Sequence, residues 1–89
     1  MKLDEGFLIR DIAGEDVLVP IGSKVIDFKG LITLTPVGGF IYRLLGDKKS
    51  QDEIVDTIIR EYDVCRETAE SDLAEFLVSL REQGVLTDE

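Results

Sequence analysis

The spacing of hydrophobic residues changes once along the chain, at Thr35. Before Thr35, apolar residues fall in short runs that contain many β-branched side chains, which is typical of strands. After it they recur three and four residues apart, beginning with Phe40, Ile41, Leu44 and Leu45, which is typical of amphipathic helices. The pattern therefore predicts an α+β fold in which an N-terminal sheet precedes a set of helices.

The first two strands are predicted to form an antiparallel hairpin. Residues 6–12 and 15–21 are both rich in apolar side chains, and only Ala13 and Gly14 separate them. Two runs joined so closely indicate a tight turn between paired strands. Pro20 has no N–H to donate to a ladder, so it should lie at a strand end or on an edge.

The rest of the sheet is less sharply defined by the pattern. Residues 25–28 form a third candidate strand, and Lys29 with Gly30 can make a tight turn after it. Residues 31–34 then form a brief apolar and β-branched run directly before the first helix. The sheet therefore has three or four short strands, and the sequence leaves their number open.

Capping residues mark the first two helices. Thr35 offers a hydroxyl to the free amides of a first helical turn, and Pro36 has the fixed φ that suits the first helical position. Ser50 and Glu53 match the capping box of a second helix. The second helix should end near Tyr62.

A third helix is predicted over about residues 66–83. Gly84 suits the position that follows a helix, and Val85 can make the hydrophobic contact that accompanies such an end. The predicted buried stripe consists of Ala69, Leu73, Phe76, Leu77 and Leu80. Residues 1–89 are expected to form a single domain.

Composition narrows the chemistry. The 10 Lys and Arg against 19 Asp and Glu give a net charge of -9, which disfavours a nucleic-acid partner. The chain has no histidine, and Cys65 is its single cysteine. We therefore expect no enzyme activity, no cofactor and no metal site. No segment approaches the roughly 20 apolar residues that span a bilayer, so we expect no membrane association and a cytoplasmic location.

Five short segments carry recognisable motifs: residues 6–15, 27–38, 41–45, 62–64 and 76–86. In their order and spacing, these motifs resemble those of the PqqD family. Thr35 stands where that family often has asparagine, and Tyr42 where it often has tryptophan. A Pro-Glu-Gly turn typical of the members that act in cofactor biosynthesis is missing, so the chain is more similar to relatives that serve other peptide-modification systems.

The resemblance implies a fold and a function. Members of the family are small proteins with a winged helix-turn-helix-like fold that recognise ribosomally made, post-translationally modified peptides. They hold the leader segment of a precursor peptide and present it to a modifying enzyme, often a radical SAM enzyme. On this basis we expect a non-catalytic leader-peptide carrier, monomeric or paired with a second copy through its free sheet edge.

The expected peptide site combines a strand and a helix. A small sheet leaves an edge with unpaired amides and carbonyls, to which an extended peptide can add a strand. In the family this edge is the strand before the first helix, and the third helix forms the other wall. Either Leu31 with Thr33 or Ile32 with Leu34 must face the core. The expected site residues are Leu31, Ile32, Thr33 and Leu34 on the strand and Ala74, Val78 and Arg81 on the helix, with Arg81 positioned to pair with a leader carboxylate.

Two other functions are compatible with parts of the pattern. A winged-helix DNA-binding regulator is the first alternative, but the third helix would present five acids against Arg66 and Arg81 to the phosphates. An acyl carrier protein is the second, but Ser71 precedes Asp72 inside a helix and lacks the Asp-Ser-Leu context that carriers need. Both are less consistent with the residues than a peptide carrier.

Overall fold

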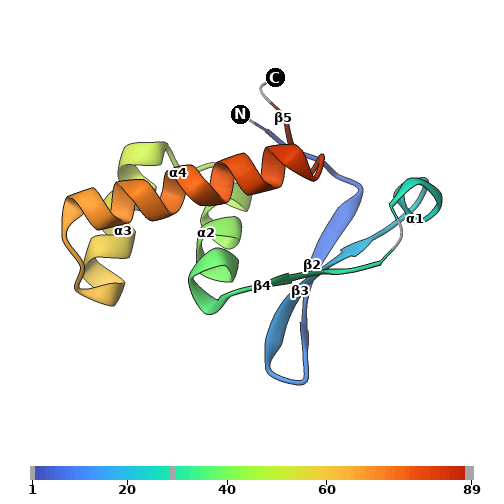
Figure 1. Cartoon of the computed structure of the whole chain (residues 1–89), viewed down its shortest axis with the longest axis horizontal. Coiled ribbons are helices and arrows are strands. Elements are labelled where there is room, and N and C mark those ends of the chain that lie inside the picture. Colours follow the sequence, from blue (N-terminus) through green and yellow to red (C-terminus); the bar gives the residue numbers. More distant parts are fainter. Residues whose placement is uncertain (1, 29, 88–89) are drawn as a thin grey trace.

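A three-stranded antiparallel sheet lies beside three long helices in the computed structural model, which describes residues 2–28 and 30–87 (Figure 1). The predicted α+β class is confirmed. No helix in these two described ranges is long and apolar enough to span a membrane. The elements are β1 (Lys2–Leu3), β2 (Phe7–Ile12), β3 (Glu15–Pro20), α1 (Lys24–Asp27), β4 (Ile32–Leu34), α2 (Pro36–Gly46), α3 (Gln51–Tyr62), α4 (Arg66–Glu82) and β5 (Leu86–Thr87).

The predicted hairpin is formed by β2 and β3. Ala13 and Gly14 have φ values of 54° and 85°, and a turn with two positive φ angles matches the twist of the flanking strands. The Gly14 N–H also donates to the Asp11 carboxylate at 3.0 Å. The strand order is β2-β3-β4, with Val17 opposite Thr33, so β4 is an edge strand of a three-stranded sheet.

The prediction of a strand at residues 25–28 is wrong, because this segment forms the short helix α1. The Phe28 N–H donates to the Lys24 carbonyl at 2.7 Å, which closes the helical turn. The turn brings the Phe28 ring edge-on to Phe7, with ring centroids 5.3 Å apart. Packing against the core thus overrides the β-branched pattern. Of the predicted turn that follows, Lys29 lies outside the described residues, while Gly30 has a φ of 111°.

Helix α2 begins as the sequence predicts and carries two buried glycines. The Thr35 hydroxyl accepts from the Gly38 N–H at 3.0 Å, and Pro36 occupies the first helical turn. A β-carbon on Gly39 would lie 2.0 Å from an Asp16 carboxylate oxygen. Glycine at this helical position therefore lets β3 approach α2 closely.

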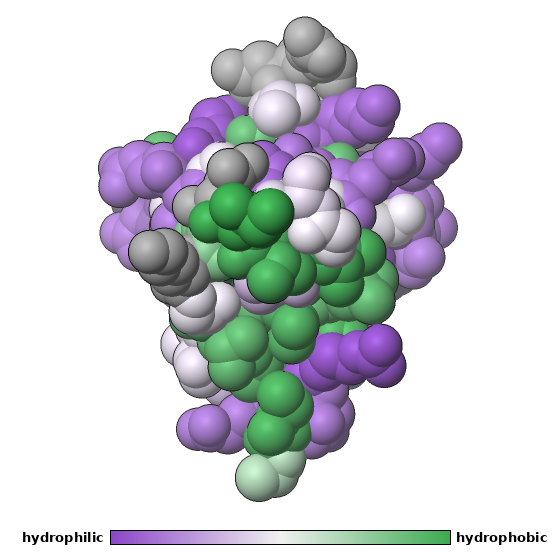
Figure 2. All heavy atoms as spheres, turned by 90° about the vertical axis from the view of Figure 1, so that its right-hand side faces the viewer, coloured by the Kyte–Doolittle hydropathy of each residue, from purple (hydrophilic) through white to green (hydrophobic). Residues whose placement is uncertain are grey.

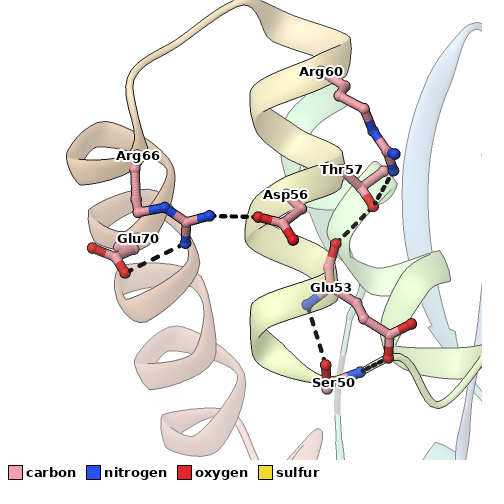
Figure 3. A network of polar contacts seen from close by, with 7 residues as sticks. All are labelled: Ser50, Glu53, Asp56, Thr57, Arg60, Arg66 and Glu70. Carbon is pink, nitrogen blue, oxygen red and sulfur yellow. Dashed lines mark hydrogen bonds and ion pairs between the residues drawn. The ribbon is translucent and has the colours of Figure 1, made fainter.

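Helix α3 carries the predicted capping box and is joined to α4 by an ion pair (Figure 3). Ser50 and Glu53 exchange hydrogen bonds of 3.1 Å, and the bonds that Ser50 donates lower the pKa of the Glu53 carboxyl. Arg66 on α4 contacts Asp56 on α3 and Glu70 one turn further along α4. These contacts lie on the surface and contribute little to stability individually.

Helix α4 ends as predicted, and the chain termini then pair. The Val85 N–H donates to Leu80 and the Gly84 N–H to Arg81, the two bonds of a Schellman motif. Beyond it, β5 pairs with β1, a two-stranded unit that the sequence pattern does not predict. The core consists of Phe7, Leu18, Ile32, Leu34, Ile41, Tyr42, Leu45, Ile54, Val55, Ile58, Ala69, Leu73, Leu77, Leu80, Val85 and Leu86.

Candidate functional site

Side chains at the edge strand β4 alternate between the core and the surface. Ile32 and Leu34 are each 8% exposed, whereas Leu31 is 58% exposed and Thr33 is also exposed. Within the described ranges, no strand pairs with the side of β4 that faces away from β3. The backbone amides and carbonyls directed to that side are therefore available to an added strand.

A hollow of about 360 Å³ begins where β4 ends. It lies between the start of α2, which directly follows β4, and the middle of α4. A peptide added along β4 would therefore run toward it. Its lining residues are Thr35, Val37, Gly38, Ile41, Asp72, Glu75 and Phe76. We call this hollow the α2–α4 pocket.

Phe76 and Gly38 shape the apolar part of the α2–α4 pocket. A β-carbon on Gly38 would lie 3.1 Å from the Phe76 ring, so the glycine allows the ring to lie close to the first turn of α2. Phe76 is only half-buried, unlike the other members of the predicted stripe, which are buried. The helical spacing predicts that Phe76 is a core residue, but it does not predict that Phe76 lines a pocket. A glycine near a helix start gives no indication of which ring will cover it.

The predicted site residues on the helix lie elsewhere. Ala74, Val78 and Arg81 are exposed, and none of them lines the α2–α4 pocket. At 100° per residue, Ala74 and Arg81 fall on the opposite side of the buried stripe from Asp72, and Val78 lies on the outer face of the helix. In the structure, the pocket next to the predicted strand is therefore lined by Asp72, Glu75 and Phe76 of the predicted helix, and not by the residues that the sequence indicated. A role for Ala74, Val78 and Arg81 in peptide binding stays a prediction.

An ion pair fixes the sheet against α2 beside the site. Arg43 donates to both oxygens of Asp16, at 3.2 and 2.9 Å. The hydrogen bond from Arg43 holds the pKa of Asp16 below its usual range, and the same bond raises the pKa of Arg43. Because β3 also pairs with β4, this contact helps to hold the free edge near the pocket.

The face of the sheet that points away from the core is largely apolar, although Arg10 and Glu15 also lie on it. Strand alternation places Leu8, Ile12 and Val19 on this face. Figure 2 shows hydrophobic side chains gathered over the middle of this side of the molecule, with polar residues around them. The exposed large hydrophobic residues of the sheet and α1 are Leu8, Ile12, Val25, Ile26 and Leu31.

Comparisons with known proteins show what the chain is similar to. The family model described as "Coenzyme PQQ synthesis protein D (PqqD)" matches residues 15–86. The structure "TbiB1 in Complex with the TbiA(beta) Leader Peptide" superposes with a TM-score of 0.83 and 34% identity, covering 100% of this chain and 98% of that one. "Lasso peptide synthetase B1 complexed with the leader peptide" has a TM-score of 0.78 and 25% identity, covering 93% and 92%. No curated protein matches the sequence.

Proposed function

The chain belongs to the PqqD family, and from this premise we propose that it is a non-catalytic carrier that binds the leader segment of a ribosomally made precursor peptide. The leader adds as a strand to the free edge of β4 and extends into the α2–α4 pocket. The observation that carries the proposal is this continuity: an unpaired strand edge ends at a hollow with an apolar floor.

Two further observations support leader binding. Two proteins of the same fold, 34% and 25% identical to this chain, are described as complexes with leader peptides. The side-chain arrangement of β4 also suits an added strand, because Ile32 and Leu34 anchor it in the core while its free edge stays open. Main-chain bonds to β4 would supply affinity, and the pocket would supply sequence preference.

The carrier then presents the bound precursor to a modifying enzyme. A leader added to β4 would extend the sheet, so some of its side chains would lie beside Leu31 and Thr33 on the exposed apolar face. The apolar face and the exposed side chains of the leader would then form one continuous surface to which the enzyme can bind. The similarity to a lasso peptide synthetase component favours an enzyme of lasso peptide biosynthesis over the radical SAM enzyme that the family resemblance suggests.

The test is an amide chemical-shift titration of the isotope-labelled chain with the TbiA(beta) leader peptide. We expect saturable shifts at residues 31–35, at the start of α2 and at Asp72, Glu75 and Phe76. The same peptide with its residues in scrambled order is the control, and it should leave these amides in place. Shifts at the remote α3 surface alone would contradict strand addition at β4.

A second measurement tests presentation. We expect the carrier and a modifying enzyme of lasso peptide biosynthesis to form a complex on gel filtration more strongly when the leader is present. Leu8→Asp on the apolar face should weaken this complex while leaving leader affinity unchanged. A complex that is unaffected by Leu8→Asp would place the enzyme on another surface.

A further inference from the structure

The α2–α4 pocket has two chemically different parts. Its floor is apolar, formed by Val37, Ile41 and Phe76. The side formed by α4 carries Asp72 and Glu75, and none of the described residues that line the pocket is cationic. A ligand that fits this pocket must therefore satisfy an apolar surface and two negative charges at once.

Asp72 and Glu75 share with most acids of the described residues the lack of an ion pair, and it is their place at the pocket that sets them apart. Within residues 2–28 and 30–87, neither Asp72 nor Glu75 forms an ion pair. Both side chains are exposed, and they are three residues apart on α4, so they lie on the same side of the helix. The acids that do form ion pairs are Asp4 with Lys24, Asp16 with Arg43, and Asp56 and Glu70 with Arg66.

An extended peptide offers a simple match to this arrangement. Alternate residues of a strand point to the same side, so a strand added to β4 would direct every second side chain toward the face of the sheet that packs on α2, beside the α2–α4 pocket. One such side chain can fill the apolar floor beside Phe76. The next one on the same side, two positions away, would then meet the carboxylates of Asp72 and Glu75.

Resting on the proposed function, we propose that the chain selects leader segments in which a hydrophobic residue and a lysine or arginine lie two positions apart. The hydrophobic side chain occupies the floor of the α2–α4 pocket, and the cation pairs with Asp72 and Glu75. The net charge of -9 adds a general attraction for basic peptides. Pairing with Asp72 and Glu75 adds a preference for a cation at one particular position of the peptide.

The experiment measures the affinity of the TbiA(beta) leader peptide in which each residue in turn is replaced by lysine, by glutamine or by glutamate. We expect one position at which lysine binds about tenfold more tightly than glutamate. In the double variant Asp72→Asn with Glu75→Gln, this difference should fall to less than about twofold. Raising the salt from about 50 to 500 mM should reduce it in the unchanged chain.

Matched variants separate local pairing from net charge. Asp52→Asn with Glu61→Gln makes the same change in charge at exposed positions on α3, and it should keep the preference for lysine. Glu75→Lys should reverse the preference at the same peptide position. A lysine preference that persists in the Asp72 and Glu75 double variant overturns the inference, as does tight binding with no charge preference at any position. Absence of binding by every peptide overturns the proposed function as well.

Discussion

Arg43 on α2 holds both carboxylate oxygens of Asp16 on β3, at 3.2 and 2.9 Å, directly beside Gly39. A two-bond contact between a guanidinium and a carboxylate fixes orientation as well as distance. Strand β3 pairs with β4, and β4 leads into α2. The contact therefore adds a direct link between β3 and α2 beside the proposed leader site. The pair therefore helps, together with the core packing of Ile32 and Leu34, to hold the edge in place relative to the pocket.

The Asp16–Arg43 pair predicts a specific pH dependence of stability. The folded-state pKa of Asp16 lies below its ordinary value of 3.8 because Arg43 donates to the carboxylate. A lowered pKa stabilises the fold above the unfolded-state pKa, and the contribution is lost as the pH falls through the folded-state value. Urea unfolding should therefore show that Asp16→Asn is less stable than the unchanged chain above about pH 4, with the difference shrinking below it. Arg43→Gln should behave in the same way, and a gap that stays constant down to low pH would contradict this account.

Gly39→Ala should destabilise the chain although alanine favours helices. The new β-carbon would lie 2.0 Å from Asp16, so the ion pair or the helix must move. We expect a loss of about 1–3 kcal/mol in the free energy of unfolding, measured with urea. Gly46→Ala is the control, because a β-carbon there meets nothing within 4 Å.

The Gly39 prediction has an internal check. Combining Gly39→Ala with Asp16→Ala removes the carboxylate that the new methyl group meets. The double variant should therefore lose less stability than the sum of the two single variants. Simple additivity would show that the crowding comes from another neighbour.

Strand addition predicts that backbone amides of the leader matter at every second position. Replacing one amide hydrogen by a methyl group removes a donor without altering the carrier. Where that amide faces β4, affinity should fall by about tenfold, and the neighbouring positions should change little. Isothermal titration calorimetry of a leader series methylated at one position each checks this. An effect that does not alternate would indicate binding through side chains rather than through the edge of β4.

The two sides of α4 are distinguished by one pair of variants. Phe76 lines the α2–α4 pocket, whereas Val78 is 50% exposed on the outer face of the helix. Phe76→Ala should weaken leader binding by about tenfold or more, and Val78→Arg by less than about threefold. Thermal unfolding of both variants controls for stability, because Phe76 is half-buried. A larger effect from Val78→Arg would favour the side of the helix that the sequence pattern indicates.

The site was only partly predictable from the sequence. The position of the edge strand before α2 follows from the change of period at Thr35, and the structure places β4 there. The side of α4 that faces the pocket does not follow, because Ala74 and Arg81 border the buried stripe on one side just as Asp72 borders it on the other. The placement of α2 and β4 decides between them.

The sequence by itself determined the features whose interactions lie within a few residues of each other. The turn at Ala13 and Gly14, the caps at Thr35 and Ser50, and the helix end at Gly84 each depend on local hydrogen bonds and φ angles. Such interactions are encoded by side chains at fixed short spacings, so a pattern can reveal them.

Only the tertiary structure decided the features that join distant segments. Residues 25–28 form a helical turn because Phe28 packs on Phe7, and Gly39 is required because Asp16 lies against it. The pairing of β1 with β5 joins residues from the two ends of the chain. Contacts of this kind depend on how whole elements pack against each other. The spacing of residues within one element does not predict that packing.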